Sequence, residues 1–479
     1  MKAYRVCKVL SVPSRASGAT ALKRNITKSD RTLTVVEGDG GIQYASLPQP
    51  SGWNGLTRLV AIFKAGSRYE TSPKLHGITH LIRRSCGLST TNYTAVNLVR
   101  HIQQMGAQLQ CHTTREHIIY SVDVAPNLAP RAGYILATMA TRTAFYEWEL
   151  KDQAHKLMRK DIDIFNRRQF DALTLDLLHD AAFGQHPDGT GLGNSLYADV
   201  NRIGTHSIDD IEAFLSQRFT PANVAFIVTG SGPGVNGLEL CESMHEAARL
   251  RPNSDVPKSS YGPKYGFIGG ERRREMTGAP ETYAALAWPT SGGRMADCET
   301  SLALSVIAAA LAPPVQSVAY GSKASLLLPS GAALATPIHF TYSDHGLFGC
   351  MISGVDGKSV GEQVVVARNS IGEIASKGLS EEQFEQAKSR LKTEVFMRAE
   401  NQVSLTTDIA VQLLDHGGDC EDNESVFRNA EDICRAVDQL QLADVNQVFE
   451  ETVTGPTMAL SCVGTDIAYV PPLASLTAA

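Results

Sequence analysis

The chain has 479 residues, of which 43% are hydrophobic and 20% are charged, and its formal net charge is -6 at neutral pH. This composition is typical of a soluble globular protein with two or three domains, and the acidic balance gives no reason to expect nucleic acid as a partner. The nine cysteines are scattered without a Cys-x-x-Cys pair, which favours free thiols and excludes the usual iron–sulfur and c-type haem motifs.

The first 29 residues differ from the rest of the chain. They contain four Lys, three Arg and several Ser and Thr, and the first acidic residue is Asp30. A basic, hydroxyl-rich and acid-free leader is typical of a mitochondrial transit peptide, so we predict one at residues 1–29. The alternative is a basic tail without fixed structure. On the first interpretation the folded protein begins near residue 30.

A strand-like run at residues 58–70 is followed by a helical segment that contains His76 and His80. Their i, i+4 spacing places both imidazoles on one face of a helix, as in many zinc sites. The chain has thirteen histidines, so such a pair can arise by chance. The preceding strand makes a zinc site, or the remnant of one, a hypothesis worth testing.

An internal repeat relates the two halves of the chain. Residues 207–230 and 442–464 align without a gap, and each predicts an amphipathic helix followed by a buried strand. The paired apolar positions are Ile211, Phe214, Leu215 and Phe219 in the first copy and Val445, Val448, Phe449 and Val453 in the second.

Other elements recur in the same order. Residues 114–124 and 343–355 both predict strands, and long helical patterns follow them at 146–183 and 380–414. The apolar stretch 301–314 ends in two prolines and predicts a buried helix, too short to span a membrane.

The strands and helices come in runs, which favours an α+β fold. We therefore predict two tandem homologous domains, each a mostly antiparallel sheet covered by helices. The predicted divisions are a transit peptide at 1–29, an N-terminal domain at 30–250, a linker at 251–266 and a C-terminal domain at 267–479.

The segments "KAGSRYET…HGITHLIRRS" (64–85) and 102–124 resemble the mitochondrial processing peptidase family of inverted-motif zinc peptidases, the M16 family. That family also includes the core proteins of the mitochondrial cytochrome bc1 complex. The resemblance extends over nearly the whole chain after residue 29 and includes the repeated pair of domains. It implies the M16 type of fold for both domains.

Active members of this family read His-x-x-Glu-His: the histidines bind zinc, the Glu is the general base, and a distant Glu completes the ligand set. The resemblance places the two ligands at His76 and His80 and the base at Thr79. Counting without gaps from residues 114–117 places the distant ligand at Lys160. A threonine hydroxyl cannot take a proton from water near neutral pH, and an ammonium group repels a metal ion.

A slip in this alignment would put Asp161 or Asp163 at the distant position, but their side chains point about 100° and 300° away from that of Lys160 around a helix. We therefore expect a vestigial site, with no catalytic residue, no functional zinc and no cofactor. The histidines that could in principle replace the lost ligands are His112, His117, His155 and His179, and each has the context of an ordinary surface or core residue.

Two further segments distinguish branches of the family. The non-catalytic subunit of the processing peptidase carries a glycine-rich loop in its second domain, whereas the matching residues 319–340 contain only two glycines here. Residues 338–354 resemble the pattern of the non-catalytic complex III core proteins. His76 differs from the pattern of many of these core proteins, which lack this histidine, and agrees with the pattern of the active peptidases.

The resemblance therefore implies a non-catalytic core subunit of mitochondrial ubiquinol–cytochrome c reductase (complex III), peripheral on the matrix side of the inner membrane and without its own redox centre. The implied partners are a core protein 1-like subunit and other complex III subunits, with a presequence peptide in the inter-domain cavity as a further expectation. The alternative is a non-catalytic or weakly active subunit of a processing peptidase that binds or cleaves presequences. A free-standing matrix homologue has no feature in its favour.

Overall fold

The computed structural model describes residues 22–25, 32–49, 55–185, 190–232, 234–250, 266–290, 293, 298–312, 326–328, 333–416, 428–455 and 457–477. The predicted linker lies outside these ranges except for Gly266, and so does the predicted transit peptide except for β1 (Leu22–Asn25). Most of the loop at 319–332 also lies outside them.

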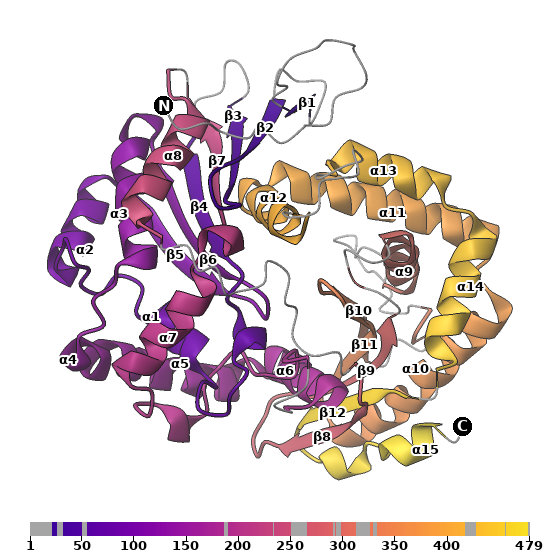
Figure 1. Cartoon of the computed structure of the whole chain (residues 1–479). Helices are drawn as coiled ribbons and strands as arrows, with labels where there is room; N and C mark the ends of the chain where they lie inside the picture. Colours follow the sequence, from indigo (N-terminus) through magenta and orange to yellow (C-terminus); the bar gives the residue numbers. More distant parts are fainter. Residues whose placement is uncertain are drawn as a thin grey trace. The chain divides into compact units, whose positions relative to one another are not determined.

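The described residues form two compact units, each built around one sheet (Figure 1). The first unit takes its described residues from Met1–Lys160, Leu196–Ser260 and Met397–Asp432. The second takes them from Asp161–Ser195, Tyr261–Phe396 and Ile433–Ala479.

The first sheet has seven strands in the order β1-β2-β3-β7-β4-β6-β5. Its strands after β1 are β2 (Thr32–Glu37), β3 (Gln43–Pro48), β4 (Thr57–Phe63), β5 (Gln108–Thr113), β6 (Ile118–Val124) and β7 (Val224–Ser231). Neighbouring strands are antiparallel except β3 and β7, which are parallel. Strand β4 is buried along its whole length because helices cover both faces of the sheet centre.

The second sheet has five strands in the order β10-β11-β9-β12-β8. They are β8 (Gly270–Glu275), β9 (Thr282–Thr290), β10 (Leu334–Thr341), β11 (Gly346–Gly354) and β12 (Ala459–Gly464). The single parallel pair is β12 with β8, and the other pairs are antiparallel. Strand for strand this repeats the order and directions of β5-β6-β4-β7-β3, which confirms the predicted α+β fold of two related domains.

The repeated sequence segments occupy equivalent places. Helix α7 (Ile208–Arg218) precedes β7, and α14 (Leu442–Val453) precedes β12. The other helices are α1 (Ile78–Arg84), α2 (Ala95–Gln104), α3 (Ala129–Thr141), α4 (Glu147–Glu149), α5 (His155–Arg168), α6 (Phe170–Phe183), α8 (Gly237–Ala248), α9 (Cys298–Leu311), α10 (Gly357–Lys377), α11 (Glu381–Glu400), α12 (Gln402–His416), α13 (Ala430–Gln439) and α15 (Leu473–Thr477).

Each half of the sequence contributes one helix to the sheet of the other half. Helix α6, from the first half, packs on β12, β9 and β8, where Leu178 and Phe183 join a core cluster with Leu347. Helix α12, from the second half, packs on β7 and β4, where Ile409 and Leu413 join a cluster on the first sheet. The compact units therefore do not coincide with the two halves of the sequence.

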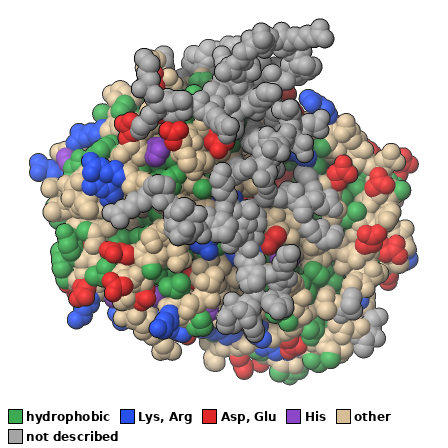
Figure 2. Space-filling model, viewed as in Figure 1, with side chains coloured by type: hydrophobic (Ala, Val, Ile, Leu, Met, Phe, Trp, Pro, Cys, Tyr) green, Lys and Arg blue, Asp and Glu red, His purple; other side chains and the backbone are tan. Residues whose placement is uncertain are grey.

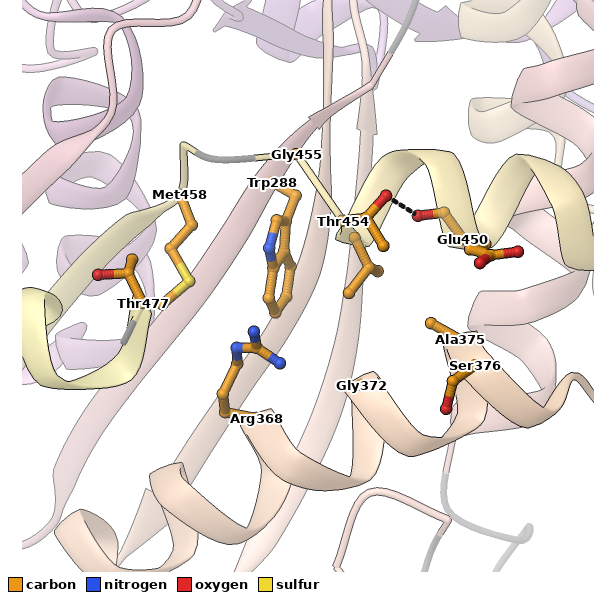
Figure 3. A pocket seen from close by; sticks show the side chains of 11 residues that line it. Trp288, Arg368, Gly372, Ala375, Ser376, Glu450, Thr454, Gly455, Met458 and Thr477 are labelled. Carbon is orange, nitrogen blue, oxygen red and sulfur yellow. Dashed lines mark hydrogen bonds between the residues drawn. The ribbon is translucent and has the colours of Figure 1, made fainter. Parts of the chain in front are cut away.

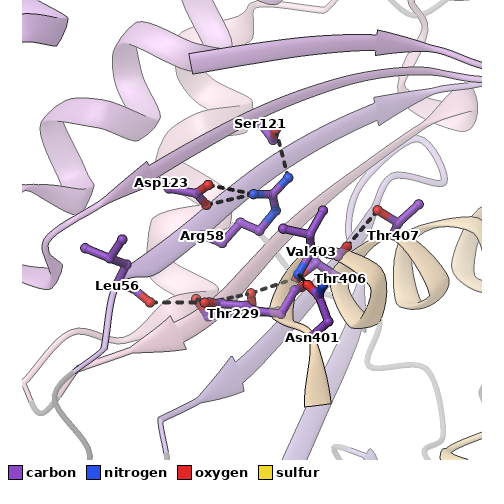
Figure 4. A network of polar contacts seen from close by, with 10 residues as sticks. Leu56, Arg58, Ser121, Asp123, Thr229, Asn401, Val403, Thr406 and Thr407 are labelled. Atoms are coloured by element: carbon purple, nitrogen blue, oxygen red, sulfur yellow. Dashed lines mark hydrogen bonds and ion pairs between the residues drawn. The ribbon is translucent and has the colours of Figure 1, made fainter. Parts of the chain in front are cut away.

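Polar contacts fix the position of α12 on the first sheet (Figure 4). The buried hydroxyls of Thr406 and Thr229 lie 2.9 Å apart. The Gln402 side-chain amide donates to the carbonyl oxygens of Thr229 at 3.2 Å and Leu56 at 3.3 Å. On the neighbouring strands, Arg58 of β4 is paired with an aspartate of β6 at 2.7 Å.

None of the helices in the described part of the chain combines the length and the apolar composition needed to cross a membrane.

Candidate functional site

The candidate site lies at the start of α1 in the first unit. The residue before the helix, Gly77, has φ 88°, in the left-handed region that favours glycine. A β-carbon at this position would lie 2.4 Å from Cβ of Ala198, so a larger residue would collide with that segment. The local sequence therefore places glycine between the two histidines for a structural reason.

A buried glutamate holds the first turn of α1. The Glu70 carboxylate accepts hydrogen bonds from the backbone N–H of Gly77 at 2.8 Å, from that of Thr79 at 3.0 Å, and from the Thr79 hydroxyl at 2.6 Å. These bonds satisfy N–H groups that lack partners within a helix. Burial raises the pKa of Glu70 to about 7, although the three hydrogen bonds act in the opposite direction.

Thr79, at the position that the family pattern assigns to the general base, therefore donates its hydroxyl hydrogen to Glu70. The residue is 1% exposed. In this arrangement its side chain stabilises the start of the helix. A hydroxyl engaged in this way does not supply a base for water activation near neutral pH.

His80 is fully buried, with its ring edge-on to Tyr197. Its Nδ1 accepts a hydrogen bond from the backbone N–H of Ala198 at 3.2 Å. A ring that accepts at Nδ1 is neutral and carries its proton on Nε2. A protonated Nε2 has no lone pair for a metal ion, and in zinc sites the second nitrogen of a ligating histidine normally donates rather than accepts.

His76 lies in the turn before α1 and is half-buried. Its backbone carbonyl accepts a hydrogen bond from Nε2 of His206 at 3.2 Å. Burial, with a contribution from Arg202, lowers the pKa of the His76 imidazole. Burial also lowers the pKa of His206 and of His155, the first residue of α5.

Lys160 is exposed on α5. It follows His155 by five residues, so its side chain points about 140° away from that histidine around the helix. Within the described ranges, no three His, Cys, Asp or Glu side chains are grouped so that they could hold a metal ion. With His80 in the tautomer described above, the residues present do not fit a peptidase zinc site, and we derive no chemical step through zinc.

The other histidines considered as ligands are dispersed. His112 is exposed on β5, and His117 is buried just before β6. His179 belongs to the second unit, where its ring nitrogens lie 2.6 Å from the Leu175 carbonyl and 2.6 Å from the Tyr342 hydroxyl.

Each unit has a cavity among its described residues. In the first unit, a cavity of about 640 Å³ lies between the start of α5 and the start of α7, and His155 and His206 line it. In the second unit, a cavity of about 280 Å³ is lined by Trp288, Arg368 and Met458 (Figure 3). The Arg368 guanidinium carbon lies 5.9 Å from the centre of the Trp288 ring, at the range of a cation–π contact.

The sequence-based prediction assigned no role to Glu70, although this residue lies in the segment "KAGSRYET" that carries the resemblance. Its signal in the sequence was its isolation, because it is the single acidic residue between Asp39 and Glu116. The neighbouring Arg68 was missed in the same way: its guanidinium pairs with the Glu116 carboxylate at 2.9 Å, and both side chains are buried.

The two related sheets and the spaced histidines at the start of α1 are features of a two-domain protein of the M16 type, and comparison with protein families agrees. The family described as insulinase (peptidase family M16) matches residues 57–196, and the peptidase M16 inactive domain matches residues 206–391. Together these matches span more than half of the chain. The protein belongs to peptidase family M16.

Curated relatives divide between two mitochondrial assemblies. The chain is 28% identical to mitochondrial-processing peptidase subunit alpha of Solanum tuberosum, over 82% of this chain and 75% of the relative. It is 26% identical to cytochrome b-c1 complex subunit 2 of Homo sapiens, over 91% of both chains. It is 27% identical to ubiquinol-cytochrome-c reductase complex core protein I of Euglena gracilis, over 74% of this chain and 73% of the relative.

Proposed function

We propose that this protein is a non-catalytic core subunit of mitochondrial complex III, of the core protein 2 type, that supports assembly and stability of the complex. In this role it is peripheral on the matrix side of the inner membrane. It forms a heterodimer with a core protein 1-like subunit of the same family and contacts other complex III subunits. A presequence peptide is a further proposed ligand.

The main support for the proposal is that the side chains of Thr79 and His80, two residues of the motif, bond to other parts of the protein and stabilise its fold. The Thr79 hydroxyl is bonded to buried Glu70, and Nδ1 of His80 is bonded to the backbone of Ala198. The first residue cannot act as a base, and the second holds its remaining ring nitrogen in the protonated form. The engaged Thr79 hydroxyl and His80 ring are both consistent with a subunit that binds other proteins through its surface and does not catalyse a reaction.

The match to cytochrome b-c1 complex subunit 2 of Homo sapiens supports the complex III assignment, because it covers 91% of both chains. The match to the Solanum tuberosum peptidase subunit covers 75% of that protein. The acid-free segment at residues 1–29 supports import into mitochondria.

A second candidate function is the non-catalytic or weakly active subunit of a mitochondrial processing peptidase, which would bind or cleave presequences. The 28% identity to the Solanum tuberosum alpha subunit favours it. In that case the chain would be found with a catalytic M16 partner and not with cytochromes.

Native electrophoresis of mitochondrial membranes from the source organism, solubilised in mild detergent, separates the two candidates. We expect the tagged full chain to migrate with cytochrome b and cytochrome c1. Recovery of the chain only in a smaller complex that cleaves presequences would overturn the complex III assignment in favour of the second candidate.

A cleavage assay with a synthetic presequence tests the loss of catalysis separately. We expect the purified chain alone to contain no stoichiometric zinc and to leave the peptide intact. The variant Thr79→Glu restores the motif, and we expect it to remain inactive because His80 and Lys160 still do not offer a ligand set. Zinc-dependent cleavage that is lost in His80→Ala would contradict this interpretation.

A further inference from the structure

Two cysteines lie together where α1 packs on strand β5 of the first unit. Cys86 is in the turn that follows α1, and Cys111 is in the middle of β5. The helix and the strand are in direct contact. Both cysteines are partly exposed, whereas the other cysteines whose side chains the structure describes, Cys241, Cys350, Cys434 and Cys462, are buried.

The contact between helix and strand places these thiols side by side. The Arg83 guanidinium, near the end of α1, donates to the Thr113 hydroxyl on β5 at 3.1 Å. Cys86 follows Arg83 by three residues and lies on the same side of the helical turn. Cys111 precedes Thr113 by two residues and lies on the same face of the strand. Cys86 and Cys111 therefore lie next to Arg83 and Thr113 along the same contact between helix and strand, close enough for Cys86 to act on the ionisation of Cys111.

We propose that Cys86 and Cys111 form a redox-sensitive thiol pair that closes to a disulfide when the protein meets a hydroperoxide. The oxidant is a small hydroperoxide such as hydrogen peroxide, and the reductant that reopens the bond is a dithiol.

The reaction is balanced in two steps. The Cys86 sulfur attacks the terminal peroxide oxygen, the O–O bond breaks, and hydrogen peroxide is reduced to water while Cys86 becomes a sulfenic acid. The Cys111 sulfur then attacks the Cys86 sulfur, the S–O bond breaks, and the leaving hydroxide takes the Cys111 proton to give a second water. Two thiols together lose two electrons, and one peroxide gains them.

The surroundings assign the order of the steps. Burial raises the pKa of the Cys111 thiol well above its usual range, so this residue stays protonated and is the resolving partner. Cys86 therefore reacts first with the peroxide. The Arg83 guanidinium acts on the Cys111 thiol in the opposite direction to burial, so it stabilises the negative charge that develops on this sulfur when it attacks Cys86.

The disulfide would connect α1, which carries Thr79 and His80, to the edge of the first sheet. It would close a loop that contains α2 (Ala95–Gln104). Closing a loop restricts the unfolded chain, so we expect the oxidised protein to unfold at a higher temperature than the reduced protein.

Peptide mapping tests the proposal directly on the full chain. The folded protein is treated with hydrogen peroxide, its remaining thiols are blocked, and it is digested with trypsin without reduction. Cleavage after Arg84, Arg100 and Arg115 places Cys86 in the peptide 85–100 and Cys111 in the peptide 101–115. We expect these two peptides as one linked species, loss of two of the nine thiols, and recovery of both after dithiothreitol.

Serine variants provide the controls. Cys86→Ser and Cys111→Ser should each abolish the linked species, and Cys111→Ser should accumulate sulfenic acid at Cys86, which a dimedone probe traps. The matched control Cys241→Ser should leave the linked species unchanged. The proposal is overturned if folded wild-type protein gives no linked pair, or if the pair forms equally well in denaturant, where the fold no longer holds the thiols together.

Discussion

Replacing Thr79 with valine tests the structural role of the residue at the former base position. Valine has nearly the same shape but lacks the hydroxyl that donates to Glu70 at 2.6 Å. The Glu70 oxygen would keep only the backbone N–H of Thr79, at 3.0 Å. Losing a hydrogen bond to a charged, buried carboxylate costs about 1.5–3 kcal/mol, which corresponds to a decrease of about 3–12 °C in the Tm of a domain of this size.

The assay is thermal unfolding of the full chain at a pH of about 8, above the pKa of Glu70, followed by circular dichroism. Thr79→Ser is the matched control: it keeps the hydroxyl and should lose only the smaller contribution of one methyl group. In the double variant with Glu70→Gln, the effect of Thr79→Val should shrink because its partner is no longer charged. The reasoning fails if Thr79→Val unfolds at the wild-type temperature, or if the valine and serine variants are equally destabilised.

Three further predictions concern the same unit. Burial raises the pKa of Glu70 from 4.5 to about 7, so between these pH values the folded state keeps a proton that the unfolded state has released. The free energy of unfolding, relative to that of Glu70→Gln, should therefore be highest below pH 4.5, fall by about 3 kcal/mol as the pH rises to about 7, and then stay constant. Urea titrations across this pH range would measure the change. Thr229→Val or Thr406→Val alone should cost about 0.5–1.5 kcal/mol by removing the hydrogen bond between the two hydroxyls, since the remaining hydroxyl keeps its bond to Gln402, and the double valine variant should cost less than the sum of the two single variants, as a double-mutant cycle would measure. Gly77→Ala should destabilise the protein more than Gly87→Ala, because both glycines have positive φ but only the β-carbon at position 77 meets another residue; equal decreases in Tm would argue against the packing shown.

Several strands and helices were predictable because each carries its own hydrophobic period. Helix α7 with β7 and helix α14 with β12 are predicted from segments of about twenty residues. The packing of α6 on the second sheet and of α12 on the first sheet, an exchange of helices between the two halves of the sequence, was not predictable in this way. An apolar helix face predicts that the helix will be buried, but its hydrophobic periodicity does not indicate which sheet it will pack against.

In the candidate site, too, some features could be predicted from the sequence and others could not. The spacing of His76 and His80 and the identity of Thr79 are visible in the sequence, and so is the chemical weakness of the motif. The state of His80 is not, because its ring is fixed by a backbone N–H that lies 118 residues away in the chain. Glu70 is close in sequence, but its role depends on a chain reversal that returns the turn at Gly77 to its carboxylate.

The exchanged helix gives a prediction about the minimum folding unit. Residues 30–250 form a domain by sequence order, but they lack α12, which covers one face of the first sheet. Ile409, Leu413 and Leu414 are each at most 2% exposed in this position. Burying such side chains stabilises a fold by about 1.5–3 kcal/mol each, so their loss removes about 5–9 kcal/mol, comparable to the stability of a whole domain.

We therefore expect residues 30–250 alone to give no cooperative unfolding transition and to bind a hydrophobic dye. Adding residues 397–416 through a flexible linker should restore the transition, because this segment supplies α12 and its apolar face. The same fusion with Ile409→Asp and Leu413→Asp should fail, since the charges would enter the core cluster. A cooperative transition in residues 30–250 without the added helix would show that the exchanged helix is dispensable for the first sheet, and that the sequence boundary at residue 250 is also a folding boundary.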